Sequence, residues 1–181
     1  MRISRKQCPT IFVPASVQRE TISHIRACGE KSAEGFVAWA GVKGRTGIEV
    51  RSVLIPQRNG SEEFACVMLS DDSMEHFSTE MITRGETLIA QVHSHPFEAF
   101  HSETDNQFPL IHRTGFLSIV IPYFGRYGFE EVKRFRFFEY VSDGQWNALN
   151  NKAVKKRLAF EGASKWKKIR LIKNSILGRR N

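Results

Sequence analysis

The sequence has few of the features that mark secreted, membrane-spanning or disulfide-bonded proteins. It has only three cysteines in 181 residues, widely spaced and without a C-x-x-C pair. That pattern argues against both a disulfide framework and a thiolate zinc site. No apolar run approaches the roughly 18 residues that a membrane-spanning helix needs. Pro14 breaks the apolar stretch of the basic N-terminus, which therefore lacks a signal-peptide core, and we expect a cytoplasmic protein.

The composition is ordinary for a globular protein, but the charge is unevenly distributed. Hydrophobic residues make up 41% of the chain and charged residues 25%, and the net charge is +8. Residues 151–181 contain eleven Lys and Arg against one acid, Glu161, so this segment carries +10 and the other 150 residues carry −2. We therefore predict a domain over 1–150 and a basic, helical C-terminal segment over 151–181.

Hydrophobic periodicity and turn residues predict alternating strands and helices. The expected strands cover 34–41, 47–56, 63–69, 87–96, 115–125 and 129–141. The expected helices cover 15–28, 73–85 with Asp71 and Asp72 as caps, a stretch beginning near Ser102, and a short stretch that follows a turn within 143–150. The run at 115–125 is continuously apolar, as is typical of a central strand buried on both faces. The pattern predicts a single α/β (α+β) domain.

Residues 93–105, HSHPFEAFHSETD, contain the pattern with the clearest chemistry. Side chains two apart on a strand point the same way, so His93 and His95 can present their imidazoles to one point. Pro96 ends the strand, and a helix starting near Ser102 could return Asp105 to the two rings. Two imidazoles and one carboxylate leave a fourth tetrahedral position open, as in catalytic zinc sites.

Each part of this pattern also has a structural interpretation. An H-x-H pair alone is more often a pair of hydrogen-bonded strand residues, and S-x-x-D alone is a helix capping box. Glu34 alone is an ordinary acid at the start of a strand. The histidine pair, the proline stop and the Ser-x-x-Asp spacing occur together within thirteen residues, and this combination favours the metal site.

The sequence has an upstream Glu, then H-x-H-P, then S-x-x-D. This order resembles the JAMM motif of the JAB/MPN metalloprotease family, and the residues HSHP…AFHSETD are most similar to its bacterial branch. The resemblance covers most of residues 15–150. It implies a JAB/MPN-like domain in which helices flank a central mixed sheet, similar to the layered architecture of cytidine deaminases. It also implies that Zn²⁺ is bound by His93, His95 and Asp105, with Glu34 as the base and Ser102 as the hydroxyl that stabilises the oxyanion.

This chain departs from the family pattern in one place. Six residues separate His95 from Ser102, where the family usually has seven, but the Ser-x-x-Asp spacing is kept. His101 is more simply explained as a loop or supporting residue than as a ligand. Glu30 is the rival to Glu34 as the base, but it lies before the expected strand and fits the family alignment less well.

The resemblance implies an isopeptidase that acts on a ubiquitin-like protein or its conjugates. Bacterial relatives accompany E1-like and E2-like enzymes in defence operons, where they remove or mature the modifier. The extended modifier tail would bind by strand addition beside the metal.

Two other functions remain open. The basic C-terminal segment, with Trp166 among its cations, could bind nucleic acid, although an amphipathic helix that packs on the domain or a partner is the simpler interpretation. A phage-tail or cell-wall amidase on the same fold is also possible. A nucleotide deaminase is disfavoured, because its H-x-E and P-C-x-x-C elements are absent.

Overall fold

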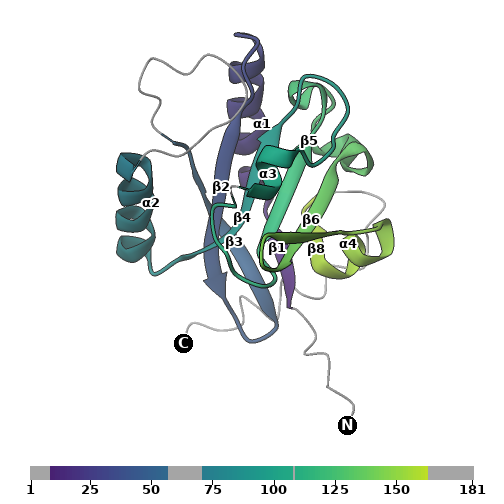
Figure 1. Ribbon diagram of the computed structural model, residues 1–181. Coiled ribbons are helices and arrows are strands. Elements are labelled where there is room, and N and C mark those ends of the chain that lie inside the picture. Colours follow the sequence, from purple (N-terminus) through teal and green to yellow (C-terminus); the bar gives the residue numbers. More distant parts are fainter. Residues whose placement is uncertain (1–8, 57–70, 108, 163–181) are drawn as a thin grey trace.

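The structure is a computed structural model that describes residues 9–56, 71–107 and 109–162. Its centre is one mixed sheet with the strand order β7-β6-β5-β4-β2-β3-β1-β8 (Figure 1). The strands are β1 Thr10–Val13, β2 Phe36–Lys43, β3 Gly47–Leu54, β4 Thr87–Ser94, β5 Leu117–Ile121, β6 Arg136–Ser142, β7 Gln145–Ala148 and β8 Leu158–Phe160. The helices are α1 Ala15–Gly29, α2 Asp71–Arg84, α3 Glu103–Gln107 and α4 Asn151–Arg157, with 3₁₀ turns η1 Tyr123–Gly125 and η2 Phe129–Arg134.

β4 lies in the middle of the sheet. It pairs antiparallel with β2, where Phe36 is opposite His93, and parallel with β5, where His93 is opposite Val120. All five residues of β5 are buried, which confirms the prediction of a central strand. The carboxyl end of β4 is therefore held by strands on both sides.

The two faces of the sheet are covered by different helices, as alternation along β2 shows. Val37 and Trp39 pack in the cluster that contains the apolar face of α1, whereas Ala38 packs with Phe77 of α2 on the other face. In Figure 1, α1 lies behind the sheet and α3 lies in front of it. The expected α/β architecture is confirmed.

Several boundaries differ from the sequence-based expectation. The short helix expected within 143–150 is wrong, because Asp143 and Gly144 both have positive φ and turn the chain into a hairpin between β6 and β7. The strand expected over 129–141 starts only at Arg136, since the residues before it form η2. β1 and β8 were not predicted. The strand expected over 63–69 lies outside the described residues.

Part of the predicted basic segment belongs to the sheet. Residues 151–157 form α4, and β8 follows it and pairs parallel with β1 at the sheet edge. The rest of the predicted segment, from 163 onward, lies outside the described ranges. No helix within those ranges is long and apolar enough to cross a membrane.

Candidate metal centre

The two histidines of the H-x-H pair lie together at the carboxyl end of β4. His93 is the penultimate residue of the strand, and His95 follows directly after it. Both side chains are buried, at 6% and 5% exposure, and their ring centroids are 5.2 Å apart. The i, i+2 spacing on a strand therefore places both imidazoles in one place, as predicted.

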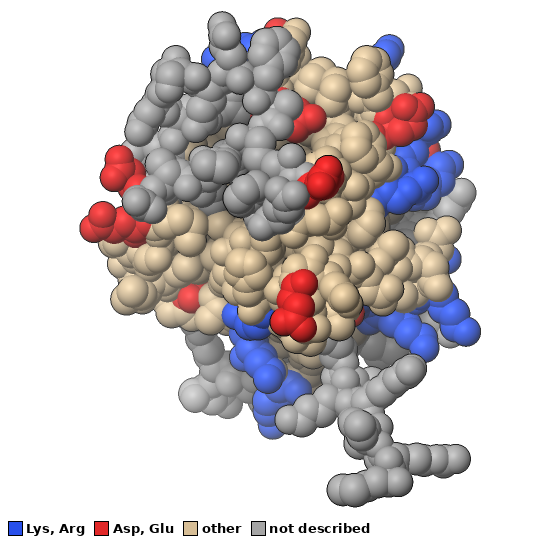
Figure 2. Space-filling model, in the orientation of Figure 1, with Lys and Arg blue, Asp and Glu red and all other residues tan. Residues whose placement is uncertain are grey.

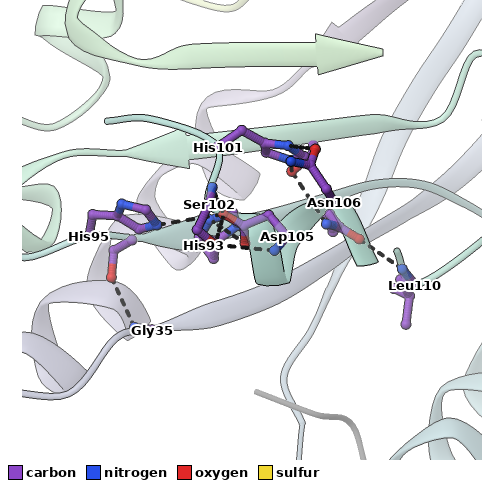
Figure 3. A network of polar contacts seen from close by, with 11 residues as sticks. Gly35, His93, His95, His101, Ser102, Asp105, Asn106 and Leu110 are labelled. Atoms are coloured by element: carbon purple, nitrogen blue, oxygen red, sulfur yellow. Dashed lines mark hydrogen bonds and ion pairs between the residues drawn. The ribbon is translucent and has the colours of Figure 1, made fainter. Parts of the chain in front are cut away.

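Asp105, in the first turn of α3, completes the group. Its Oδ1 lies 3.1 Å from His93 Nε2, and its Oδ2 lies 3.8 Å from His95 Nε2. One potential ligand atom from each of the three residues falls within 4.8 Å of the other two. Figure 3 shows the three side chains converging from β4 and α3. The structure thus brings together all three predicted ligands.

The potential ligand atoms lie close together, but they do not satisfy one another's hydrogen-bonding capacity. His93 Nε2 is buried and has no well-aligned hydrogen-bond partner in the described part of the chain, although a carboxylate oxygen lies 3.1 Å away. A buried polar atom in this state is costly unless something else binds it. Two imidazole nitrogens and a carboxylate oxygen are suitable donors for zinc and similar divalent metals. The residues therefore fit a metal ion.

The protonation states also suit a metal ligand set. Burial lowers the pKa of His95 to about 4, and the neighbouring His93 acts in the same direction. Burial alone would raise the pKa of Asp105, but the close approach and the charge of His93, together with the bonds from Ser102, hold it well below its usual value. At neutral pH, His95 is thus a neutral imidazole and Asp105 a carboxylate, the forms that bind metal.

Ser102 caps the helix that carries Asp105. Its hydroxyl and its backbone N–H each donate to Asp105 Oδ2 at 2.7 Å, and the Asp105 N–H donates to Ser102 Oγ at 3.1 Å. This reciprocal pair is the capping box considered from the sequence. The capping interpretation and the metal interpretation are therefore compatible, because the same bonds fix the orientation of the carboxylate.

Glu34 lies two residues before β2, and its pKa is affected by the charges of His93 and Asp105. Burial raises its pKa, the charge of His93 opposes this, and the charge of Asp105 adds to it. The strand beside it is tied to β4, since Gly35 N–H donates to Ser94 Oγ and Gly35 C=O accepts from Ser94 N–H, both at 2.9 Å.

The rival acid, Glu30, is an exposed residue that caps the C-terminus of α1. The structure brings Glu34 to the three predicted ligands, whereas no contact in the described ranges joins Glu30 to them.

His101 is close to the site but binds other residues. Its Nδ1 lies 2.8 Å from Asn106 Oδ1 and its Nε2 lies 3.2 Å from Ser118 Oγ. Burial lowers the pKa of His101, which favours a neutral ring. These contacts match the expectation of a supporting residue. Asn106 and Ser118 were not found by sequence reasoning, because only the strand register and the turn into α3 bring them to His101.

The part of the chain that contains this site is similar to known proteins. A family model described as prokaryotic homologs of the JAB domain matches residues 14–122, a range that contains Glu34, both histidines and Asp105. The "Probable metalloprotease y4jG" of Sinorhizobium fredii (strain NBRC 101917 / NGR234) is 29% identical over 144 residues, which cover 77% of this chain and 87% of that protein.

A solved structure shares the fold. The solution structure of protein DSY2949 from Desulfitobacterium hafniense matches with a TM-score of 0.53 at 17% identity, over 84% of this chain and 93% of its own. The family match spans more than half of the sequence. This chain therefore belongs to the prokaryotic homologs of the JAB domain.

Proposed function

We propose that this protein is a zinc-dependent isopeptidase that hydrolyses the amide bond after the C-terminal tail of a ubiquitin-like modifier. The observation that carries the proposal is the convergence of His93, His95 and Asp105 beside the partly buried carboxyl group of Glu34. The family and the relative named a probable metalloprotease support peptide-bond hydrolysis. We propose a bacterial conjugation system used in antiphage defence as its setting, with E1-like and E2-like enzymes as partners.

His93, His95 and Asp105 would hold the metal, which when bound supplies a Lewis acid for the attacking water and the scissile carbonyl. Glu34 accepts a proton from the water as the water oxygen bonds to the carbonyl carbon. Glu34 then gives that proton to the nitrogen as the C–N bond breaks, leaving a carboxylic acid and an amine. The raised pKa of Glu34 suits both steps, because a shuttle works best with a pKa closer to the working pH.

We also propose a role for Ser102 in the reaction. Its hydroxyl proton points to Asp105 Oδ2 in the structure. Stabilising an oxyanion requires that proton to turn toward the substrate, while the Ser102 backbone N–H keeps its own bond to the carboxylate. We therefore assign Ser102 two roles, first as the cap of α3 and then as a hydrogen-bond donor to the reacting carbonyl oxygen.

The sheet limits how a modifier tail can approach. β4 is paired with β2 on one side and with β5 on the other, so no extended peptide can add to β4 itself. Two exposed aromatic residues, Phe97 and Phe100, lie in the loop that joins the ligands, and the Phe100 ring packs edge-on against His95. We propose that the tail crosses the end of β4 against this loop.

Glu34→Gln tests the mechanism. The amide keeps the size of the side chain but cannot shuttle a proton, so we expect normal zinc content and a loss of cleavage on the order of 10²–10⁴-fold. Zinc is measured by elemental analysis, and cleavage is measured on a ubiquitin-like protein extended beyond its C-terminal glycines. Glu30→Gln, at the exposed end of α1, is the matched control and should remain active. Undiminished cleavage by Glu34→Gln would remove Glu34 from the mechanism.

A second candidate, polyanion binding, is supported by one surface. Lys43, Arg45, Lys155 and Lys156 line a hollow of about 780 Å³ between the β2–β3 hairpin and α4. Figure 2 shows Lys and Arg gathered along the lower and right-hand margins of the view, where these elements lie. Nucleic-acid retention that falls steeply with salt, and that is lost when Lys43 and Arg45 are changed to Glu, would support this function.

A further inference from the structure

A chain of hydrogen bonds with a single direction runs beside the candidate metal centre, and Figure 3 labels His101, Asn106 and Leu110 from it. The Leu110 N–H donates to Gln91 Oε1 at 2.9 Å, and Gln91 Nε2 donates to Ser118 Oγ at 3.3 Å. The Ser118 hydroxyl is then free to donate to His101 Nε2, 3.2 Å away. His101 Nδ1 completes the chain by donating to Asn106 Oδ1 at 2.8 Å.

This direction fixes the tautomer of His101. Asn106 Oδ1 can only accept, so the ring proton lies on Nδ1, and Nε2 is left as the acceptor for the Ser118 hydroxyl. Each hydrogen bond of this series then joins one donor to one acceptor. Ser118 is completely buried and Gln91 is 3% exposed, so leaving either without a partner would be costly.

This series of hydrogen bonds connects α3 to the sheet on both sides of the helix. His101 precedes α3 and contacts Ser118 of β5, while Leu110 follows α3 and contacts Gln91 of β4. A helix of five residues is too short to be stable by its own hydrogen bonds. The position of α3, and with it that of Asp105, therefore depends on such contacts.

The His101 ring is also held by its aromatic neighbours. It stacks on Phe138 of β6, with centroids 4.2 Å apart, and meets the edge of Trp146 of β7 at 5.0 Å. Two hydrogen bonds and two ring contacts leave little freedom of rotation. A side chain fixed in this way can set the position of the backbone that leads into α3.

We infer that His101 is a positioning residue, which holds α3 so that the Asp105 carboxylate stays within ligating distance of His93 and His95. The inference rests on the metal site of the proposed function, and it assigns no ligand or catalytic role to His101. Residues that orient ligands from behind change metal affinity by about 10–100-fold when they are replaced.

His101→Phe tests the inference, because a phenyl ring keeps the aromatic contacts and removes both hydrogen bonds. The probe is zinc alone, with its dissociation constant measured by competition with a chelator on the full chain, and cobalt(II) absorption reports the ligand geometry. We expect His101→Phe to bind zinc about 10–100-fold more weakly and to change the cobalt spectrum. His101→Gln, which can donate and accept again, should recover part of the affinity.

Phe137→Leu is the control for general destabilisation. Phe137 neighbours Phe138 on β6 but packs in the cluster on the α1 side of the sheet. This variant should lower the unfolding midpoint of the metal-free protein and leave the zinc affinity within about threefold of wild type.

Three results would contradict either the inference about His101 or the proposed function. Wild-type zinc affinity in His101→Phe would overturn the inference. So would an equal loss of affinity in Phe137→Leu at matched stability, because the effect would then be general. Absence of zinc binding by the wild-type protein would instead overturn the proposed function.

Discussion

Because His95 is buried, the free energy of unfolding of the metal-free protein should depend on pH. The pKa of His95 falls from 6.5 to about 4 in the fold, so between these values the unfolded chain takes up a proton that the folded protein does not. The free energy of unfolding should therefore be highest above pH 6.5 and decrease as the pH falls toward 4, by about 3 kcal/mol. His101, whose pKa is also lowered by burial, adds to the effect in the same direction.

Denaturant unfolding of chelator-treated protein at several pH values between about 7 and 4.5 measures this loss. The lower limit stays above the range in which Asp105 takes up its proton, since the pKa of that group is depressed. His95→Gln removes one titrating ring and should make the profile less steep, with the contribution of His101 remaining. An equally steep profile in His95→Gln would assign the pH dependence to other groups.

The ligands could be predicted from the sequence, but their supporting residues could not. His93, His95 and Asp105 lie within thirteen residues, and local spacing on a strand and in a helix cap determines where they point. The partners of His101 depend on long-range pairing. Ser118 comes from another strand, and its place beside His101 follows from the register of β4 with β5.

At the scale of elements, the start of β2 is packed against the backbone of α1. A Cβ on Gly35 would lie 2.8 Å from the Cα of Ile25, closer than real Cβ contacts. Gly35→Ala should therefore push β2 away from α1 and destabilise the protein by about 1–3 kcal/mol. The same shift would move Glu34, the neighbouring residue, so cleavage should fall more than stability alone explains.

Gly44→Ala is the matched control, because a Cβ there would meet only the Gly47 carbonyl oxygen, at 3.6 Å. Thermal unfolding and cleavage rates of the two variants decide the matter. Equal stability of both would show that α1 and β2 adjust to the extra methyl group, contrary to the prediction.

Elements with strong local signals were predicted, and those defined by distant pairing were not. α2 ends at Arg84, before Gly85 with its positive φ, as its glycine indicated. The Asp143-Gly144 pair is a strong hairpin signal, and a turn was expected there, but the residues after it were assigned to a short helix, so β7 was missed. β1 and β8 have four and three residues, too few for periodicity to reveal.

At the scale of the whole molecule, charge did not mark the edge of the sheet. The predicted boundary at residue 150 follows the change in net charge, whereas β8 pairs with β1 beyond it. Arg157 shows why the change in net charge does not coincide with the edge of the sheet, because its cationic side chain is buried, at 8% exposure. It pairs with Glu139 at 3.0 Å and donates to the carbonyl oxygens of Pro9 and Gly115. A basic residue here joins segments from both ends of the described chain.

Two shortened chains test how much of the C-terminal segment the domain needs. A chain ending at Asn150 loses the buried side chains of Val154, Leu158 and Phe160, each worth about 1.5–3 kcal/mol. That total is comparable to the whole stability of a domain, so we expect this chain to lose cooperative unfolding and zinc binding. A chain ending at Gly162 keeps α4, β8 and the bond from the Ala15 N–H to Glu161, and it should unfold cooperatively. Thermal unfolding followed by circular dichroism compares them, and cooperative unfolding of the chain ending at Asn150 would mean that β8 is dispensable.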